Sequence, residues 1–335
     1  MTSSKTPGLT SVFLAFVGNL FIAFMKLGAF FISGSSVMFS EAIHSFADTA
    51  NQSLLMVGIK KSQKKADAHY EYGYGQERFL WALISACGIF FLGAGVTIYH
   101  GIESLTLTGP ILLNKYVFII LGLSFIIESL TLFVAINEIK KHSRGRKFFH
   151  ALEHADPTTL AVVYEDSVAV LGVIVAFISM LLTLATGKHY WDAIGSLIIG
   201  ALLGFIAVVL IRKNMNLLKS QSMPDDVKEK LMDILKAEPA IEKIIDLKST
   251  ILNVGVYRIK CEVEFNGPSL LRELYKPNEM KDEYNDIKED YQEFIRFCAD
   301  YADRIPRLIG SKINKIEEKI QLEIPEIRHI DIELN

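Results

Sequence analysis

Long apolar runs constrain this chain more than any other feature of its sequence. A run of about 20 apolar residues is long enough to cross the hydrocarbon core of a bilayer. Half of the 335 residues are hydrophobic, and the mean hydropathy of +0.30 is high for a soluble enzyme. The sequence therefore predicts a polytopic α-helical membrane protein with six spans, near residues 9–33, 36–58, 79–101, 116–138, 158–185 and 191–212. The second and fifth are the most polar, and an even number of crossings is part of the reason for including them.

Positive charges in the loops predict the orientation of these spans. Basic residues gather after the second, fourth and sixth runs, at Lys60, Lys61, Lys64, Lys65, Lys140, Lys141, Arg144, Arg146, Lys147, Arg212, Lys213 and Lys219. The opposite loops carry little more than Lys115 and Lys188. Because positive loops stay in the cytosol, we expect both termini there, in the cell (inner) membrane if the source is bacterial. The first run lacks a basic leader and a cleavage site, so we expect it to be retained.

Two aspartates are predicted to begin membrane helices rather than bind metal. Asp156 with Pro157 is typical of a helix start before the fifth span, and Asp192 of a cap for the sixth. His150 and His154, in the basic loop, are more typical of a solvated loop than of a cation entrance.

The sequence changes character near residue 216, where a second domain is predicted to begin. An amphipathic helix opens at Pro224 and Asp225, and two strands follow between residues 243 and 265. An acidic helical insertion is predicted near 269–302, then a helix over 304–324 and a last strand at 327–334. The order αββαβ predicts a cytosolic α+β domain of the ferredoxin-like kind over 216–335, beside a transport domain over 1–215.

Several functional classes are disfavoured by what the sequence lacks. The net charge of −3 gives no reason to expect nucleic acid as a partner. The three cysteines form no CxxC pair, and no GxxxxGK[ST] loop for ATP is present. An intramembrane metalloenzyme is disfavoured because HExxH and GxSxG are both absent. We therefore expect no enzyme and no organic cofactor.

A polar stripe follows one face of the second span. At 100° per residue, six side chains fall within about one third of that helix: Glu41, His44, Ser45, Asp48, Asn51 and Gln52. Charged groups inside a membrane are costly and usually functional. His44 and Asp48, four residues apart, are predicted to bind a metal ion, while the hydroxyl and amide groups more often join helices. Glu41 is either a carboxylate on the release path or a charge at the helix start.

The fifth span supplies a matching carboxylate, Asp166, with Glu165 pointing about 100° away from it. Two carboxylates and a neutral imidazole sum to −2, which suits a divalent cation, Zn²⁺ first, with Mn²⁺, Co²⁺ or Fe²⁺ as alternatives. Lys26 in the first span is predicted to pair with Glu165 or Glu128, as a structural lock that leaves the charge of the site unchanged.

These motifs resemble the cation diffusion facilitators, the ZnT-type zinc transporters. The similar stretches are SGSSVMFSEAIHSFAD, HYEYGYGQERFLWALIS, YEDSVAVLGVI, WDAIGSLIIG and PEIRHIDIEL, which span nearly the whole chain. The Glu165–Asp166 pair and the insertion near 269–302 are most similar to the zinc transporter 9-like branch. The resemblance implies a homodimer that exports divalent cations from the cytosol, and the absence of an ATP site favours exchange for protons with alternating access.

The family's transport site is four side chains, and three of them carry over as His44, Asp48 and Asp166. The fourth position is Val162, which cannot ligate, so a water, Glu165 or Asn19 would complete the set. Weaker secondary sites are implied at Asp67 with His69, where Tyr74 replaces a later histidine, and at His329 with Asp331. A metal-sensing or scaffold protein that has lost transport is the alternative motivated by Val162.

Overall fold

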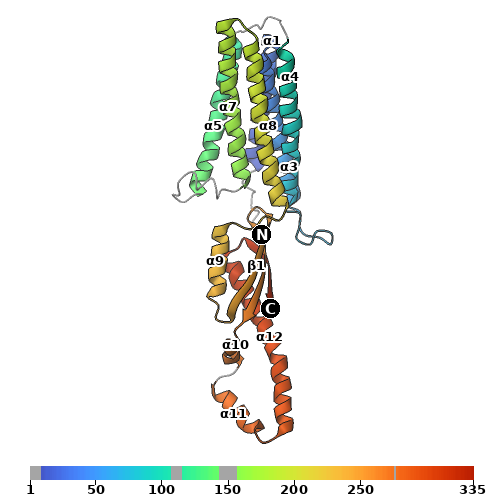
Figure 1. The fold of residues 1–335 in the computed structure, drawn as a ribbon, viewed down its shortest axis with the longest axis vertical. Helices are drawn as coiled ribbons and strands as arrows, with labels where there is room; N and C mark the ends of the chain where they lie inside the picture. The colour runs from blue at the N-terminus through green and yellow to red at the C-terminus, as the bar shows by residue number, and fades with distance from the viewer. Residues whose placement is uncertain (1–8, 107–114, 143–156, 275–276) are drawn as a thin grey trace. The chain divides into compact units, whose positions relative to one another are not determined.

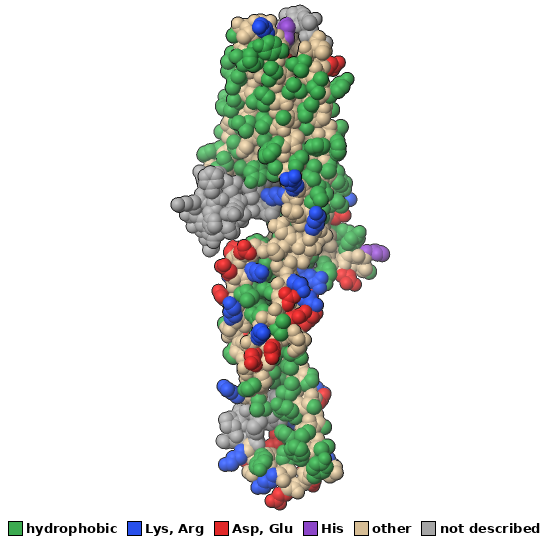
Figure 2. Space-filling model, in the orientation of Figure 1, with side chains coloured by type: hydrophobic (Ala, Val, Ile, Leu, Met, Phe, Trp, Pro, Cys, Tyr) green, Lys and Arg blue, Asp and Glu red, His purple; other side chains and the backbone are tan. Residues whose placement is uncertain are grey.

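A computed structural model describes residues 9–106, 115–142, 157–274 and 277–335 (Figure 1). The chain divides into two compact units, Met1–Lys219 and Ser220–Asn335. On the face shown in Figure 2, hydrophobic side chains dominate the surface of the first unit, and charged side chains are spread over the second.

The first unit is a bundle of long helices whose bounds follow the predicted spans. They are α1 (Leu9–Ser33), α2 (Ser36–Ser62), α3 (Glu77–Gly88), α4 (Val96–Ser104), α5 (Lys115–His142), α7 (Pro157–Thr186) and α8 (Tyr190–Leu218). A π-helical segment, η1 (Ile89–Gly95), joins α3 to α4 without a break, so the two make one span. Among the described residues, five spans are long and apolar enough to cross a membrane, and α2 is not one of them because its polar stripe lowers its hydropathy.

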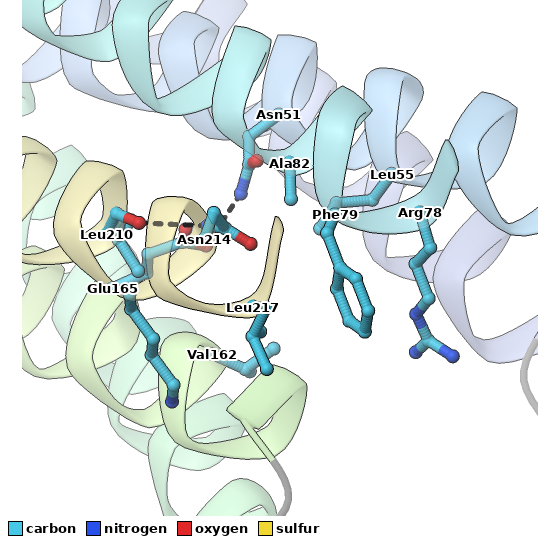
Figure 3. A pocket seen from close by; sticks show the side chains of 11 residues that line it. Asn51, Leu55, Arg78, Phe79, Ala82, Val162, Glu165, Leu210, Asn214 and Leu217 are labelled. Carbon is cyan, nitrogen blue, oxygen red and sulfur yellow. Dashed lines mark hydrogen bonds between the residues drawn. The ribbon is translucent and has the colours of Figure 1, made fainter. Parts of the chain in front are cut away.

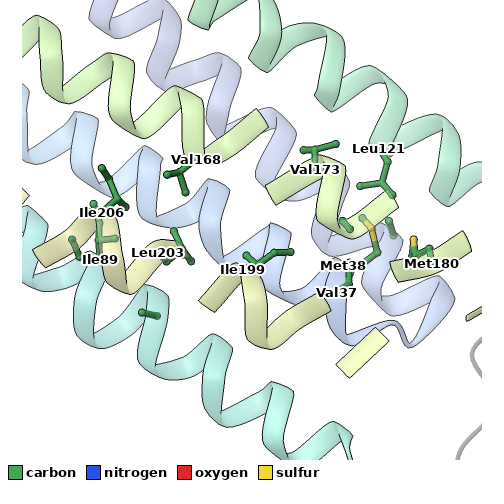
Figure 4. Packing of buried hydrophobic residues seen from close by; sticks show 14 of the residues in the cluster. Val37, Met38, Ile89, Leu121, Val168, Val173, Met180, Ile199, Leu203 and Ile206 are labelled. Carbon is green, nitrogen blue, oxygen red and sulfur yellow. The ribbon is translucent and has the colours of Figure 1, made fainter. Parts of the chain in front are cut away.

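Helix α2 occupies the centre of the bundle, in contact with α1, α3, α7 and α8. Buried aliphatic side chains from these helices and α5 form one core, including Met38, Leu121, Val173 and Leu203 (Figure 4). Helices that lack a hydrophobic drive to associate in lipid depend on such close packing. A central α2 keeps its polar face away from the outer surface.

The sequence predicted that Asp192 caps its own helix, and this prediction is wrong. The residue before α8 is His189, with no side-chain cap, and Asp192 lies in the first turn. Its carboxylate accepts hydrogen bonds from Ser35 Oγ and from the backbone N–H groups of Ser36 and Val37. Ser35 is the N-cap of α2, accepting from the N–H of Met38, and Asp192 supplements it because packing of α8 against α2 brings the carboxylate to the first N–H groups of that helix. Helix α7 begins at Pro157 as predicted, while Asp156, His150 and His154 lie outside the described residues.

The second unit follows the predicted order of helices and strands. It contains α9 (Asp225–Lys236), β1 (Ile241–Asn253), β2 (Val256–Phe265), α10 (Gly267–Leu274), α11 (Pro277–Ile287), α12 (Tyr291–Glu323) and β3 (Ile327–Leu334). The sheet has the order β1-β2-β3, with β1 antiparallel and β3 parallel to β2. Gly255, at φ 66°, makes the tight turn between β1 and β2 that a side chain would strain.

The prediction of a new helix starting near residue 304 is wrong. Helix α12 runs without a break from Tyr291, with Pro306 inside it. Asp290 caps it by accepting from the N–H groups of Gln292 and Glu293. A proline removes only one N–H from the helical ladder, and the turns that carry Ile316 and Ile320 are anchored in the core of the unit. Part of the acidic insertion is therefore the first half of the main helix.

Candidate metal centre

The middle of α2 holds the predicted histidine–aspartate pair. His44 Nε2 lies 3.2 Å from Asp48 Oδ2, one helical turn away. His44 is 3% exposed, and its Nε2 atom makes no hydrogen bond within the described residues. A buried ring nitrogen without a hydrogen bond is rare, and it is the atom with which a histidine binds a metal.

Asp166 faces this pair from α7, the helix that packs beside α2. It interacts electrostatically with Asp48, and its carboxyl group interacts with the hydroxyl of Thr131 on α5. Within the described part of the chain, no three His, Cys, Asp or Glu side chains are gathered closely enough to hold a metal ion. The structure therefore brings His44 and Asp48 together and places Asp166 nearby, outside a shared coordination shell.

Glu165, next to Asp166 on α7, contacts α2 through Asn51. Its Oε2 atom accepts a hydrogen bond of 2.7 Å from Asn51 Nδ2, and Asn51 Oδ1 accepts one of 2.6 Å from Ser85 on α3. Asn51 therefore joins three helices, which confirms the prediction for this amide. Of the two partners that the sequence offered for Lys26, Glu165 is the one that the structure engages elsewhere, with Asn51.

Glu165 and Val162 line a pocket between the ends of α2, α3, α7 and α8 (Figure 3). Its other lining residues are Asn51, Leu55, Arg78, Phe79, Ala82, Leu210, Lys213, Asn214 and Leu217. Because Glu165 precedes Asp166 in the chain, the pocket reaches the turn of α7 that carries one of the predicted ligands. A cation in this pocket would meet the Glu165 carboxylate.

Lys26 forms two buried ion pairs rather than one. Its Nζ atom lies 2.6 Å from Glu41 Oε2 and 2.7 Å from Glu128 Oε1. The pairing with Glu128 confirms the prediction. The second partner of Lys26 is Glu41, which the sequence had not predicted to pair with it, and the packing of α1 against α2 brings the two side chains together. The lock that the sequence predicted with one carboxylate therefore contains two.

Other candidate ligands lie in different surroundings. Asn19 is half-buried on α1, and Gln52 Oε1 is buried without a hydrogen bond within the described residues.

Sequence reasoning missed Thr131, although its spacing of three from Glu128 places both on one face of α5.

The weak site predicted in the loop after α2 already has protein partners. The Asp67 carboxylate accepts hydrogen bonds from Lys64 Nζ and the Tyr74 hydroxyl, each 2.8 Å long. These two hydrogen bonds lower the pKa of Asp67, and the backbone N–H groups of His69 and Tyr70 add to the effect. Tyr74 therefore serves as a hydrogen-bond donor to Asp67.

The weak site predicted on β3 is also engaged by a protein group. Asp331 Oδ2 accepts hydrogen bonds from Arg258 Nε at 3.2 Å and Arg258 Nη2 at 2.8 Å. Arg258 lies opposite His329 in the parallel pairing of β2 with β3. The Arg258 guanidinium therefore binds the Asp331 carboxylate oxygen that a metal ion would need.

Comparison with known proteins shows which family the chain belongs to. Residues 12–218 match the family described as the cation efflux transmembrane domain. The chain is 36% identical over 335 residues to the human proton-coupled zinc antiporter SLC30A9, mitochondrial, covering 98% of this chain and 59% of that protein. It is 34% identical over 323 residues to metal tolerance protein C4 of Arabidopsis thaliana, covering 94% and 71%.

A more distant relative is the manganese efflux system protein MneP of Bacillus subtilis, 21% identical over 292 residues, covering 82% of this chain and 92% of that protein. The chain spans about three-fifths of the length of the human relative.

Proposed function

Because the chain belongs to the cation efflux family, we propose that it is a secondary transporter that exports divalent metal cations, Zn²⁺ first, in exchange for protons. The observation that carries this proposal is the pair of His44, which is buried, and Asp48, 3.2 Å apart on α2, with Asp166 on the neighbouring helix α7. One imidazole and two carboxylates suit Zn²⁺ best among the divalent ions. The relatives named a zinc antiporter and a manganese efflux protein support Zn²⁺ and Mn²⁺ as the first two cations to test.

The proposal includes an arrangement in the membrane. Helix α2 also crosses the bilayer, as a sixth span shielded by α1, α3, α7 and α8. Both termini then lie in the cytosol, in the orientation that the basic loops favour. The cytosolic unit is a ferredoxin-like αββαβ layer that contributes to a homodimer.

The proposed path begins at the pocket lined by Glu165. This pocket lies where α2 and α8 end and α3 begins, which is the cytosolic side in the proposed orientation. A cation drawn toward Glu165 passes to His44, Asp48 and Asp166, and Glu165, Asn19 or a water completes four ligands in place of Val162. Buried carboxylates that repel one another bind protons readily, so protons replace the cation when the site opens to the other side.

Flux measurements in proteoliposomes test this function. Purified protein is reconstituted, Zn²⁺ uptake is followed by stopped flow, and a pH gradient is imposed in either direction. We expect the gradient to drive Zn²⁺ uphill and Asp48→Ala to abolish the flux. Zn²⁺ flux that ignores the gradient would refute proton coupling, and full transport by Asp48→Ala would refute the site.

A second candidate function is a metal-sensing or scaffold protein without transport, which Val162 motivates. Binding of Zn²⁺ by the purified protein without any flux in proteoliposomes would favour it. Competition between Zn²⁺, Mn²⁺, Co²⁺ and Fe²⁺ for the same site then ranks the cations for either function.

A further inference from the structure

A chain of two hydrogen bonds crosses one end of the pocket. Ser85 Oγ of α3 donates to Asn51 Oδ1 of α2 at 2.6 Å. Asn51 Nδ2 in turn donates to Glu165 Oε2 of α7 at 2.7 Å (Figure 3). We call these three side chains the Asn51 bridge. Asn51 is 4% exposed and Ser85 is 3% exposed, so water does not compete strongly for either hydrogen bond.

The Asn51 bridge lies between the pocket and the proposed metal site. On α2, Asn51 lines the pocket, and Asp48 lies three residues before it, about one helical turn deeper in the bundle. On α7, which begins on the pocket side, Glu165 lines the pocket and Asp166 is the next residue. A cation that moves from the pocket between α2 and α7 therefore meets the Asn51–Glu165 hydrogen bond before it reaches either aspartate.

The walls of the pocket formed by α2 and α3 are packed tightly against each other. A Cβ atom added at Gly58 of α2 would lie 2.9 Å from Trp81 Cβ of α3, so the two helices are as close as glycine allows. On the α8 wall, Asn214 donates to Leu210 of its own helix at 2.9 Å (Figure 3). The α2–α3 pair is therefore placed to move as one wall against α7. The hydrogen bond of the Asn51 bridge to α7 crosses the seam between them.

The strength of the Asn51 bridge suits a closure that opens and shuts. A side-chain hydrogen bond shifts an equilibrium by about tenfold. That is enough to favour a closed passage and too little to prevent its opening, as alternating access requires. Ser85 has a positioning role, because its hydroxyl group occupies Asn51 Oδ1 and leaves the amide N–H groups to face Glu165.

We propose that Asn51, oriented by Ser85 and hydrogen-bonded to Glu165, is an inner gate that closes the passage between the pocket and the His44–Asp48 pair. The passage opens when α7 separates from α2. A cation bound by Glu165 competes with Asn51 for the same carboxylate, so the arrival of the substrate favours opening. This inference rests on the proposed transport function, and it gives Asn51 a role in access rather than in coordination.

Access to a thiol group placed beyond the gate tests the inference. Ser45 is 4% exposed and lies on the polar face of α2, on the far side of Asn51 from the pocket, so Ser45→Cys serves as the reporter. The full chain, in sealed vesicles with a chelator and no added metal, is exposed to a charged methanethiosulfonate on one side at a time. Mass spectrometry follows the rate of modification at position 45. From the pocket side, Asn51→Ala is expected to raise this rate about tenfold.

Matched variants separate the hydrogen bond from a general loosening of the bundle. Glu165→Ala should raise the rate as Asn51→Ala does, and the double variant should be no faster, because both changes remove one bond. Glu165→Gln keeps an acceptor oxygen and should be modified at the native rate. Ser53→Ala is the control, because the Ser53 hydroxyl donates to Thr49 of its own helix at 3.1 Å, and it should leave the rate unchanged.

An unchanged rate in Asn51→Ala would overturn the inference, and so would an equal rise in Ser53→Ala. If Asn51→Ala does not fold, Asn51→Asp takes its place, because it keeps the acceptor for Ser85 and loses the N–H donor; the same rise is expected. The modification requires no metal flux. Failure of the gate therefore appears as unchanged rates, whereas failure of the proposed function appears as full Zn²⁺ transport by Asp48→Ala.

Discussion

Two groups of buried polar side chains lie on the same helix, α2, and differ in how fully they are hydrogen-bonded. The first, at the start of the helix, consists of Ser35, Ser36 and Ser40. Ser35 donates to Asp192, Ser36 Oγ pairs with His100 Nδ1 at 2.8 Å, and Ser40 Oγ pairs with the Ser196 hydroxyl at 2.5 Å. Each of these hydroxyl groups has a partner on another helix, so the group is complete without a ligand.

The second group, one to three turns further along, consists of Glu41, His44 and Asp48. Glu41 and His44 are buried about as completely as the three serines of the first group. Even so, Glu41 Oε1 and His44 Nε2 have no hydrogen bonds within the described residues. Buried polar atoms are almost always paired, so each unpaired one calls for an explanation, such as a bound ion or a catalytic role. Burial alone therefore does not separate structural from ligand-binding polar groups, but the pairing of their atoms does.

The largest effect on stability is expected from Lys26→Met, which leaves two buried carboxylates without a cation. Removal of one member of a buried ion pair costs about 3–5 kcal/mol. Chemical unfolding in detergent measures this loss of unfolding free energy. The control is the triple variant Lys26→Met, Glu41→Gln and Glu128→Gln. The control should regain most of the loss, and a single variant as stable as the native protein would contradict the two buried ion pairs.

Asp166→Ala is expected to separate function from stability. The Zn²⁺ flux should fall at least about 100-fold, equivalent to about 2.7 kcal/mol. The unfolding free energy should stay the same or rise, because the repulsion between Asp166 and Asp48 is removed. Flux close to native in proteoliposomes, at equal protein content, would remove Asp166 from the site.

Asp192→Ala is expected to show the opposite pattern. It removes the acceptor for the first N–H groups of α2 and the partner of the N-cap Ser35, at a cost of about 1–2 kcal/mol in the unfolding free energy. The KM for Zn²⁺ should not change, because the cap lies about three turns from His44 and Asp48. A KM that moves with Asp192→Ala would show that the two groups on α2 are not independent.

The smallest effect is expected in the second unit, from Asp331→Asn. Its ion pair with Arg258 is more than one third exposed on both sides, so solvent screens it and the expected loss is below about 1 kcal/mol. Urea unfolding of the full chain measures it, with Arg258→Gln as the partner variant. A larger loss, or Zn²⁺ binding abolished by Asp331→Asn, would make this surface pair a functional site.

The elements near the proposed site were more predictable than the partners of its side chains. The polar stripe of α2 follows from helical spacing, and the structure brings His44 and Asp48 together as that spacing requires. Lys26 had several carboxylates within reach along the sequence, and two of them, Glu41 and Glu128, became its partners. Helical spacing relates residues on one helix, whereas partner choice depends on how neighbouring helices rotate and pack.

The sequence by itself determined where the helices and strands form and which face of each is polar, because apolar periodicity and turn residues act over a few residues. It also determined that the membrane-spanning part contains costly charges on α2 and α7. Only the tertiary structure decided that Asp192 accepts from the first N–H groups of α2, that α12 continues through Pro306, and that Lys26 pairs with both Glu41 and Glu128. These outcomes depend on contacts between segments far apart in the chain, where the packing of whole helices overrides local preference.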